Sequence, residues 1–408
     1  LRRGADIIQS LFPELTTDAA MARSGAMPID VTRDLRWFHF GVWKRRFTAG
    51  LVIYLCNRLK LEHTIRSLVR RIDNVEFLSA HEATALCTNE NRSRVTGVTV
   101  VERKSGVGYD LEADFVVDTS GRGSRTPRWL DSLGYDRPQE SEIKVQVGYA
   151  SRIYRLQAGF DDHELPMALF PHPPHTRRLG VMYRLDERTL MLTLAGWCRD
   201  HPPRQDKGFL RFADSLEGGD FAGLLTKDAR PAPIHTHLFP SSLRRHYDQM
   251  PSWPDGFVVL GDAVCSFNPI YGQGMTVCAI EANILAHALY KLGRRGKRPQ
   301  QPGVARTIQK RFARALFTPW LMVRCEDLRF GDIPGPRPWW LRPVQWYIAE
   351  VLKAAETHRL PYLRFVEVLC FVRSPAALAH PVILGIVLWR VLKQLLPSPA
   401  KTAPSELE

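Results

Sequence analysis

The chain has 408 residues, of which 45% are apolar and 24% are charged, a composition typical of a soluble globular protein with two or three domains. Its seven cysteines are scattered without a CxxC pair, and no signal-peptide pattern opens the chain, which argues against a disulfide framework or a zinc site and favours a cytoplasmic location. The formal net charge of +14 leaves room for an anionic partner.

The first part of the chain alternates short helical and strand patterns. An amphipathic helix is predicted at Ala5–Leu11 and ends before Pro13. The aromatic run at 34–43 has a strand-like pattern that suits either a sheet core or a surface facing a flat ring system. A helix with apolar residues at helical spacing is predicted from Arg58 to about residue 71, and four short strands at 75–111 are typical of a β-meander.

A second group of strands follows in the middle of the chain. The apolar strand at 115–118 ends in an acid and leads into a glycine-rich turn at 119–125. Residues 126–255 contain several strand candidates, with a hairpin predicted at 179–197. The histidines in this region have no further ligand at convincing spacing, so no metal site is predicted: His172, His175, His235 and His237.

The most informative stretch is 256–274, which reads GFVVLGDAVCSFNPIYGQG. A short apolar run predicts a buried strand, which Gly261 and Asp262 end with one carboxylate at its carboxyl end. A loop containing Pro269 leads to Gly272–Gly274, where a long helix is expected to begin. The carboxylate can accept hydrogen bonds from sugar-type hydroxyls, and the bare amides of a helix start favour an electron-rich group. The pattern therefore predicts a site for a polyhydroxylated, electron-rich ligand.

The segment GDAVCSFNPIYGQGM resembles the second flavin motif of the FAD-dependent aromatic hydroxylase and epoxidase superfamily. In that family the Asp holds the ribityl chain of FAD, and the amides at the helix start face the N1/C2=O edge of the isoalloxazine ring. The sequence FNPIYGQG is especially similar to the motif of a subgroup that includes polyketide epoxidases. The resemblance implies cofactor contacts from Gly261, Asp262, Pro269, Gly272, Gln273 and Gly274.

Two earlier segments resemble other parts of the same family pattern. The family keeps an Arg at the start of the helix that meets FAD, and Arg58 matches it, since a guanidinium pairs well with phosphate and carbonyl oxygens. The segment 116–125 resembles the first flavin motif, although Thr119 stands where many hydroxylases have Gly. Asp118 and Gly121 are carried over from this motif as cofactor contacts.

The resemblance spans nearly the whole chain and implies a mixed α/β (α+β) fold. It predicts a Rossmann-like FAD-binding domain in two segments, 1–125 and 256–318, with an antiparallel-sheet substrate domain at 126–255 between them. A C-terminal helical region is expected at 319–396 and a disordered tail at 397–408.

One part of the family pattern is missing from this sequence. FAD enzymes of this type open with a βαβ unit carrying G-x-G-x-x-G, whose glycines let the backbone approach the pyrophosphate. Gly121–Gly123 and Gly272–Gly274 each lack the third glycine. The expected explanation is an N-terminally incomplete sequence that holds the ribityl and isoalloxazine half of the flavin site without the adenosine half. Such a chain is expected to hold FAD poorly or not at all.

A basic cluster and a helical end complete the chain. Nine Lys and Arg and no acid stand between residues 291 and 317, which indicates either a solvated surface or a site for an anion such as the phosphates of a nicotinamide cofactor. No nucleic-acid motif accompanies them, so no nucleic-acid partner is predicted. The last helical segment, 378–396, is too interrupted to span a membrane and leaves weak contact with a membrane surface open. The oligomeric state is not predicted.

The resemblance predicts an FAD-dependent monooxygenase, a hydroxylase or epoxidase, with NAD(P)H as transient reductant, O2 as oxidant and an aromatic or alkene small molecule as substrate. Because the cofactor carries this chemistry, no catalytic side chain is predicted. The alternatives are a double-bond reductase or a halogenase of the same fold, although the W-x-W-x-I-P motif expected of a halogenase is absent. A truncated, non-catalytic remnant is the third interpretation.

Overall fold

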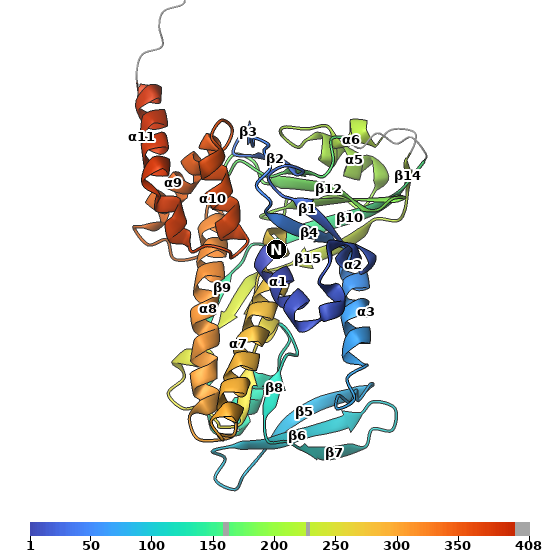
Figure 1. Ribbon diagram of the computed structural model, residues 1–408, viewed down its shortest axis with the longest axis vertical. Helices are drawn as coiled ribbons and strands as arrows, with labels where there is room; N and C mark the ends of the chain where they lie inside the picture. Colours follow the sequence, from blue (N-terminus) through green and yellow to red (C-terminus); the bar gives the residue numbers. More distant parts are fainter. Residues whose placement is uncertain (158–162, 226–228, 396–408) are drawn as a thin grey trace, which may run out of the picture.

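The computed structural model describes residues 1–157, 163–225 and 229–395, so the tail predicted to be disordered at 397–408 lies outside the described residues. The long axis of the molecule runs from a large sheet at the top of Figure 1 to a small meander at the bottom, with two long helices along one side. The predicted mixed α/β class and the helical C-terminal region are confirmed.

The large sheet has eight strands, in the order β14-β10-β13-β12-β11-β2-β3, with β15 also paired to β10. All pairs are antiparallel except β2 with β11, and the predicted hairpin is β12–β13. Strands β2 and β3 come from the predicted first segment, so the sheet combines strands from both sides of residue 125. The bounds are β2 (Arg36–His39), β3 (Val42–Trp43), β10 (Val147–Leu156), β11 (Met167–Leu169), β12 (Arg178–Asp186), β13 (Thr189–Gly196), β14 (Ala229–Pro231) and β15 (His235–Phe239).

The two faces of this sheet are buried against different helices. One face packs on α5 (Asp206–Asp214) and the short α6 (Phe221–Leu224), with Phe38 of β2 in this cluster. The opposite face packs on α10 (Arg359–Leu369), with Trp37 of the same strand in that cluster. Adjacent residues of β2 thus serve opposite faces, as the alternation of side chains along a strand requires.

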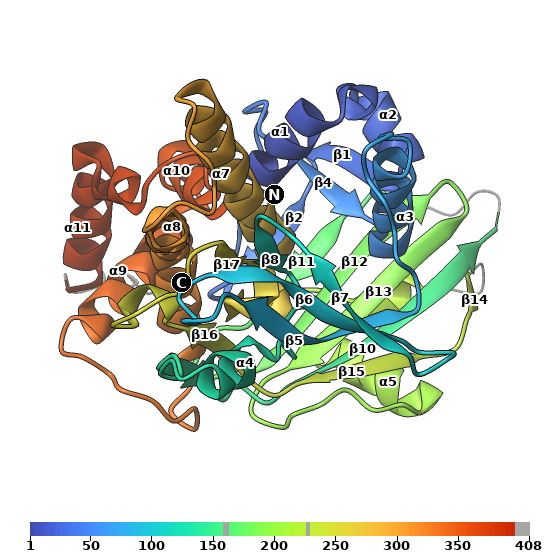
Figure 2. The same cartoon turned by 90° about the horizontal axis from the view of Figure 1, so that it is seen from below.

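The parallel part of the structure is small but brings the two flavin-like motifs side by side. Strand β8 (Val116–Asp118) pairs with β17 (Phe257–Val259), in which every residue is fully buried. Below them lies the predicted meander, which is foremost in Figure 2 and consists of β5 (His81–Thr88), β6 (Val95–Glu102) and β7 (Gly108–Glu112).

The strand predicted at 75–78 is wrong, because this segment has no strand conformation. Its apolar side chains at Val75, Phe77 and Leu78 are exposed, and Phe77 lies against the guanidinium of Arg70.

The structure also contains two further small sheets. One pairs β1 (Ala26–Asp30) with β4 (Val52–Cys56), and the other consists of β9 (Glu140–Ile143), β16 (Ser242–Arg245) and β18 (Cys265–Ser266).

The helices cover the sides of these sheets. The long pair α7 and α8 runs along one side of the molecule, and α9 to α11 pack at its upper end (Figure 1). The basic cluster extends from the last turn of α7 through the connection into the first half of α8. None of the helices in the described residues is long and apolar enough to cross a membrane. The remaining bounds are α1 (Arg2–Leu11), α2 (Asp18–Arg23), α3 (Arg58–Val69), α4 (Thr126–Ser132), α7 (Gly274–Arg294), α8 (Val304–Asp327), α9 (Leu341–Ala354) and α11 (Pro381–Leu395).

Candidate functional site

The carboxyl end of β17 turns sharply into the short 3-10 segment η3 (Gly261–Ala263). Gly261 has φ +70°, in the left-handed region that favours glycine. Its N–H donates to a carboxylate oxygen of Glu281 over 2.7 Å, and Glu281 is fully buried in α7. The turn is therefore held from behind by the helix that follows it, and Asp262 stands at the front.

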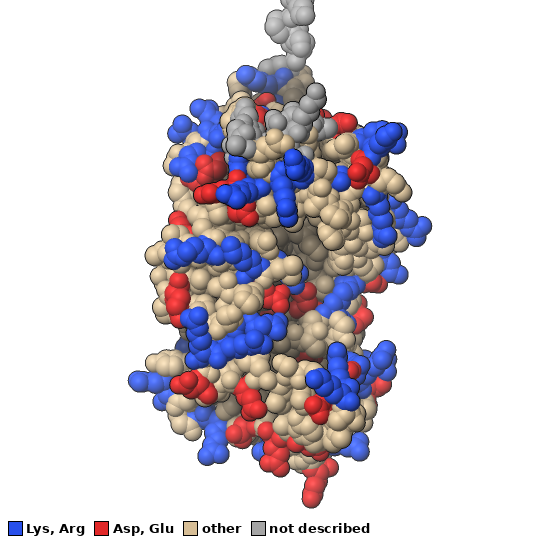
Figure 3. Space-filling view, turned by 90° about the vertical axis from the view of Figure 1, so that its right-hand side faces the viewer, with Lys and Arg blue, Asp and Glu red and all other residues tan. Residues whose placement is uncertain are grey.

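Two arginines from separate segments lie close enough to Asp262 for their charges to act on it. Partial burial raises the pKa of the Asp262 carboxyl, while the positive charges of Arg58 and Arg122 act in the opposite direction. Arg58 begins α3, which is capped by Asn57, and Arg122 lies in the turn after β8. The structure thus brings the predicted Arg58 and Asp262 into one region and adds Arg122. The face that carries α3 is hollowed across its middle, with side chains of both charges around the hollow (Figure 3).

The start of α7 presents bare backbone to open space. Gly272 has φ +62° and ends the short segment η4 (Pro269–Tyr271), and no side chain caps the helix that begins at Gly274. A methyl group placed on Gly272, Gly274 or Gly121 would meet no other heavy atom within 4 Å. The N–H groups of a helix start attract electron-rich groups, so the predicted glycines lie where a ligand can approach the backbone closely.

The carboxylate of Asp118 organises its own loop. It accepts hydrogen bonds from the Ser120 N–H (2.8 Å), the Ser124 hydroxyl (2.5 Å) and the Thr126 hydroxyl (2.6 Å), and it is 7% exposed. These bonds fix the turn that carries Gly121. The structure therefore gives Asp118 a role in shaping the loop, while its direct contact with a cofactor stays a prediction.

The buried Arg245 of β16 links the two flavin-like motifs. Its guanidinium donates to the carbonyl oxygens of Ala263 (2.9 Å) and Arg122 (3.0 Å), one in each motif, and to the carboxylate of Glu140. Nothing local in the sequence marks this arginine as buried, because a pair of arginines is equally typical of a solvated surface.

The turn that contains Pro269 is anchored by a buried acid at the end of α8. One oxygen of Asp327 accepts from the Asn268 amide (3.2 Å), the Tyr271 hydroxyl (2.7 Å) and the indole N–H of Trp197 (3.2 Å). Asp327 is fully buried, and this burial raises its pKa to about 6. The acid joins η4, the large sheet and the C-terminal helices in one network, and no pattern in the sequence marked it.

An apolar cavity of about 330 Å³ lies next to this turn. Its walls come from β2, β4, β11 and β12 on one side and from α8, α9 and α10 on the other. Tyr271 and Gln273 line it from the η4 side, and Gln273 is 1% exposed. The side chain of Gln273 therefore faces this cavity, while its backbone begins α7 at the flavin-like motif. The motif and the cavity share these two residues.

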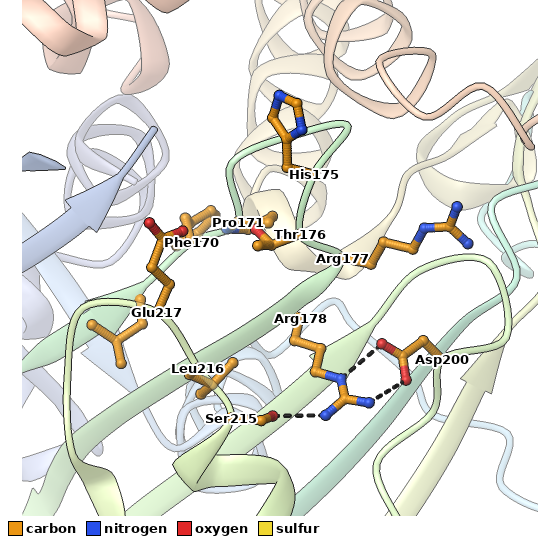
Figure 4. A pocket seen from close by; sticks show the side chains of 11 residues that line it. Phe170, Pro171, His175, Thr176, Arg177, Arg178, Asp200, Ser215, Leu216 and Glu217 are labelled. Atoms are coloured by element: carbon orange, nitrogen blue, oxygen red, sulfur yellow. Dashed lines mark hydrogen bonds and ion pairs between the residues drawn. The ribbon is translucent and has the colours of Figure 1, made fainter. Parts of the chain in front are cut away.

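A second, more polar pocket of about 290 Å³ lies nearby and shares Phe170 and Pro171 with the cavity. In Figure 4 its main cation, Arg178, is held by both oxygens of Asp200 (2.8 and 2.9 Å) and by the Ser215 hydroxyl (2.7 Å). Because the charge of Arg178 is already paired, this pocket offers less to a ligand than the region around Asp262.

Comparisons with known proteins concern the family and the fold of this chain. No family model matches the chain. Protein Rv3254 of Mycobacterium tuberculosis (strain ATCC 25618 / H37Rv) is 31% identical over 373 residues, which cover 88% of this chain and 75% of that protein.

Several solved structures share the fold at low sequence identity. PqsL of Pseudomonas aeruginosa, described as a probable FAD-dependent monooxygenase, has a TM-score of 0.60 at 17% identity over 81% of this chain and 87% of its own. A triple mutant of the flavin-dependent brominase Bmp2 has 0.55 at 14% over 88% and 86%, and the Diels-Alderase PyrE3 has 0.56 at 14% over 92% and 72%. Such identities show the fold alone. The chain belongs to the same family as Protein Rv3254, and it has the fold of the flavin-dependent monooxygenases and halogenases.

Proposed function

We propose that this protein is an FAD-dependent monooxygenase, a hydroxylase or epoxidase that uses NAD(P)H and O2 on an aromatic or alkene small molecule. The observation that carries the proposal is the junction at Gly272–Gly274. On one side an uncapped helix start faces open space, and on the other Tyr271 and Gln273 line an apolar cavity. A flat ring bound against the backbone N–H groups at the start of α7 would lie next to the apolar cavity, which suits an apolar substrate.

The residues around the junction fit the polar half of a flavin. Asp262 would accept hydrogen bonds from the ribityl hydroxyls, Arg58 would pair with phosphate or carbonyl oxygens, and the α7 amides would face the electron-rich ring edge. Arg122, whose guanidinium donates to the carbonyl and hydroxyl oxygens of Ser241 (both 2.6 Å), would add only its positive charge. When bound, FAD supplies hydride acceptance from NAD(P)H and the activation of O2. The chain's own contribution is to bind and orient both molecules and to exclude water from the cavity. Because this sequence lacks the G-x-G-x-x-G unit, FAD added to the purified protein is expected to bind only weakly, through its ribityl and isoalloxazine half. A complete failure to bind would favour the non-catalytic remnant.

Replacing Asp262 by Ala is expected to weaken FAD binding by about 10- to 100-fold, because a hydrogen bond to a charged group contributes about 1.5–3 kcal/mol. The measurement is quenching of flavin fluorescence as the protein is titrated into FAD. Asp262→Asn is the matched control and should retain part of the affinity, since its carbonyl oxygen still accepts from a hydroxyl. An Ala variant with the affinity of the parent protein would remove Asp262 from the site.

Gly274→Ala is expected to separate cofactor binding from stability. Gly274 has a negative, helical φ and begins α7, so a methyl group should raise the unfolding free energy by up to about 1 kcal/mol. The same methyl would occupy the open space in front of the helix start and weaken FAD binding. Gly293→Ala, near the other end of the same helix, is the control that should be stabilised without any change in FAD affinity. Equal FAD affinities in both variants would contradict the proposed cofactor position.

Halogenation is the second candidate, because the fold is shared with the flavin-dependent brominase Bmp2. Product analysis separates the possibilities. Monooxygenation predicts NAD(P)H-dependent O2 uptake with a hydroxylated or epoxidised product in the absence of halide. A halogenase needs halide for product formation, and a double-bond reductase reduces its substrate without O2.

A further inference from the structure

The apolar cavity beside η4 carries no unpaired charge on its walls. Among the described residues that line it, Glu326 is the only Asp, Glu, Lys or Arg. Its two oxygens accept from Arg329 over 2.8 and 3.0 Å, so its charge is compensated outside the cavity. Burial, together with the nearby Lys44 and Arg329, holds the pKa of His39 well below its ordinary value, so the imidazole is neutral. Lys44 does not line the cavity, and its ammonium donates to the carbonyl oxygens of His39 (2.6 Å) and Leu352 (2.8 Å). A charged ligand would therefore find no counter-charge on the described walls.

The cavity nevertheless contains three buried polar atoms that have no hydrogen-bond partner among the described residues. They are the indole nitrogen of Trp37, Nδ1 of His39 and the side-chain oxygen of Gln273, whose residues are 5%, 7% and 1% exposed. Buried polar groups in folded proteins are nearly always paired, so three orphans in one cavity need an explanation. The other indole and the phenol on its walls, Trp197 and Tyr271, are both satisfied by Asp327.

Two of the unpaired atoms come from adjacent positions on one face of β2. The Trp37 and His39 rings are parallel within 5°, with centroids 6.1 Å apart, and both residues line the cavity. The indole N–H can only donate, whereas a neutral imidazole has one nitrogen that accepts. A hydroxyl group on a ligand can accept from the indole N–H with its oxygen and donate its O–H to the imidazole nitrogen. Gln273 offers an acceptor from the opposite, η4 side, and that acceptor calls for a donor.

We infer that the cavity binds an uncharged, largely hydrophobic ring compound whose hydroxyl group is recognised by Trp37 and His39, with Gln273 accepting from a second polar hydrogen on the ligand. The inference rests on the proposed function, which makes this cavity the substrate site. It narrows the substrate class to neutral phenol-type or hydroxylated polycyclic molecules and excludes aromatic acids and phosphorylated compounds. The volume of about 330 Å³ is within the range of small-molecule sites, about 300–1,000 Å³.

Equilibrium dialysis with three probes of one ring system tests this inference on the purified chain without any turnover. Naphthol is expected to bind at least about fivefold more tightly than naphthalene, because its hydroxyl satisfies buried partners, and at least about tenfold more tightly than naphthoate, whose charge is uncompensated. Equal binding of naphthol and naphthalene, preferential binding of naphthoate, or no binding of any probe would each overturn it.

Trp37→Phe tests the named donor, because it keeps an aromatic ring and removes the N–H. This variant should lose about fivefold in naphthol binding, while its affinity for naphthalene stays within about twofold of the parent value. Trp339→Phe, at a residue that is 87% exposed, should leave both affinities unchanged. An unchanged naphthol preference in Trp37→Phe would overturn the assignment of this donor. FAD binding is measured separately in the same samples. A chain that binds FAD but prefers naphthoate refutes only the inferred substrate class. A chain that selects naphthol but has no affinity for FAD refutes only the proposed monooxygenase function.

Discussion

The Asp327→Ala variant is expected to lose about 3 kcal/mol or more of unfolding free energy, which would be visible as an earlier urea transition. The substitution leaves three buried donors, on Trp197, Asn268 and Tyr271, without their common acceptor. Each unsatisfied buried donor costs about 1–3 kcal/mol. Because two of these donors belong to the turn before α7, the same variant should also weaken FAD binding, although Asp327 lies behind the site.

Asp327→Asn is the matched control for this prediction. It keeps the size and one acceptor oxygen, so it should lose clearly less stability than Asp327→Ala. It also removes a titration. Burial raises the folded-state pKa of Asp327 to about 6 from its ordinary 3.8, so its stabilising contribution is complete below the lower value and is lost as pH rises through the higher one. The deficit of Asp327→Asn should therefore shrink as pH rises from about 4 to about 6 and stay constant above that. An Ala variant with the parent's transition would show that the network carries no stability.

The sequence predicted those elements whose beginning or end is marked by local residues such as glycines or a polar turn. The strand at β17 and the start of α7 follow from an apolar run and from glycines, and the β12–β13 hairpin follows from two alternating runs with a polar turn. Partner-dependent features could not be predicted in this way. Residues 75–78 are apolar enough for a strand but have no neighbouring strand, and β2 pairs with β11, which is more than a hundred residues away in the chain.

The residues of the candidate site likewise fall into those that the sequence could predict and those that it could not. Asp262 and the glycines around Gln273 could be predicted because turns and helix starts restrict residue types locally. Asp327 could not, since its partners lie 56 to 130 residues away and it resembles any polar residue at a helix end. For the aromatic run that contains Trp37 and Phe38, the sequence permits a sheet core or a ring-facing surface. The sheet core is confirmed, because these residues of β2 pack in the α5 and α10 clusters. A ring-facing role of Trp37, which lines the cavity, stays a prediction.

For the chain as it stands, the unfolding free energy is expected to fall as pH rises from about 5 to about 8 because of Glu281. This carboxyl is fully buried behind the Gly261 turn, and the loss of hydration raises its pKa to about 8 from the ordinary 4.5. The folded chain thus holds this proton more tightly than the unfolded chain does. The contribution is complete below the ordinary pKa and is lost as pH rises through the folded-state value, at up to about 1.4 kcal/mol for each pH unit.

The Glu281→Gln variant isolates this contribution, because the amide keeps the size and an acceptor for the Gly261 N–H but cannot titrate. The difference in unfolding free energy between the parent and Glu281→Gln, measured by urea denaturation at several pH values, should move in favour of Gln as pH rises. Glu281→Ala should be less stable than Gln at every pH, since it leaves both a cavity and an unpaired N–H at the turn that presents Asp262. A parent–Gln difference that is constant with pH would mean that Glu281 is already ionised when folded, and the turn would then be held by a buried charge instead of a neutral acid.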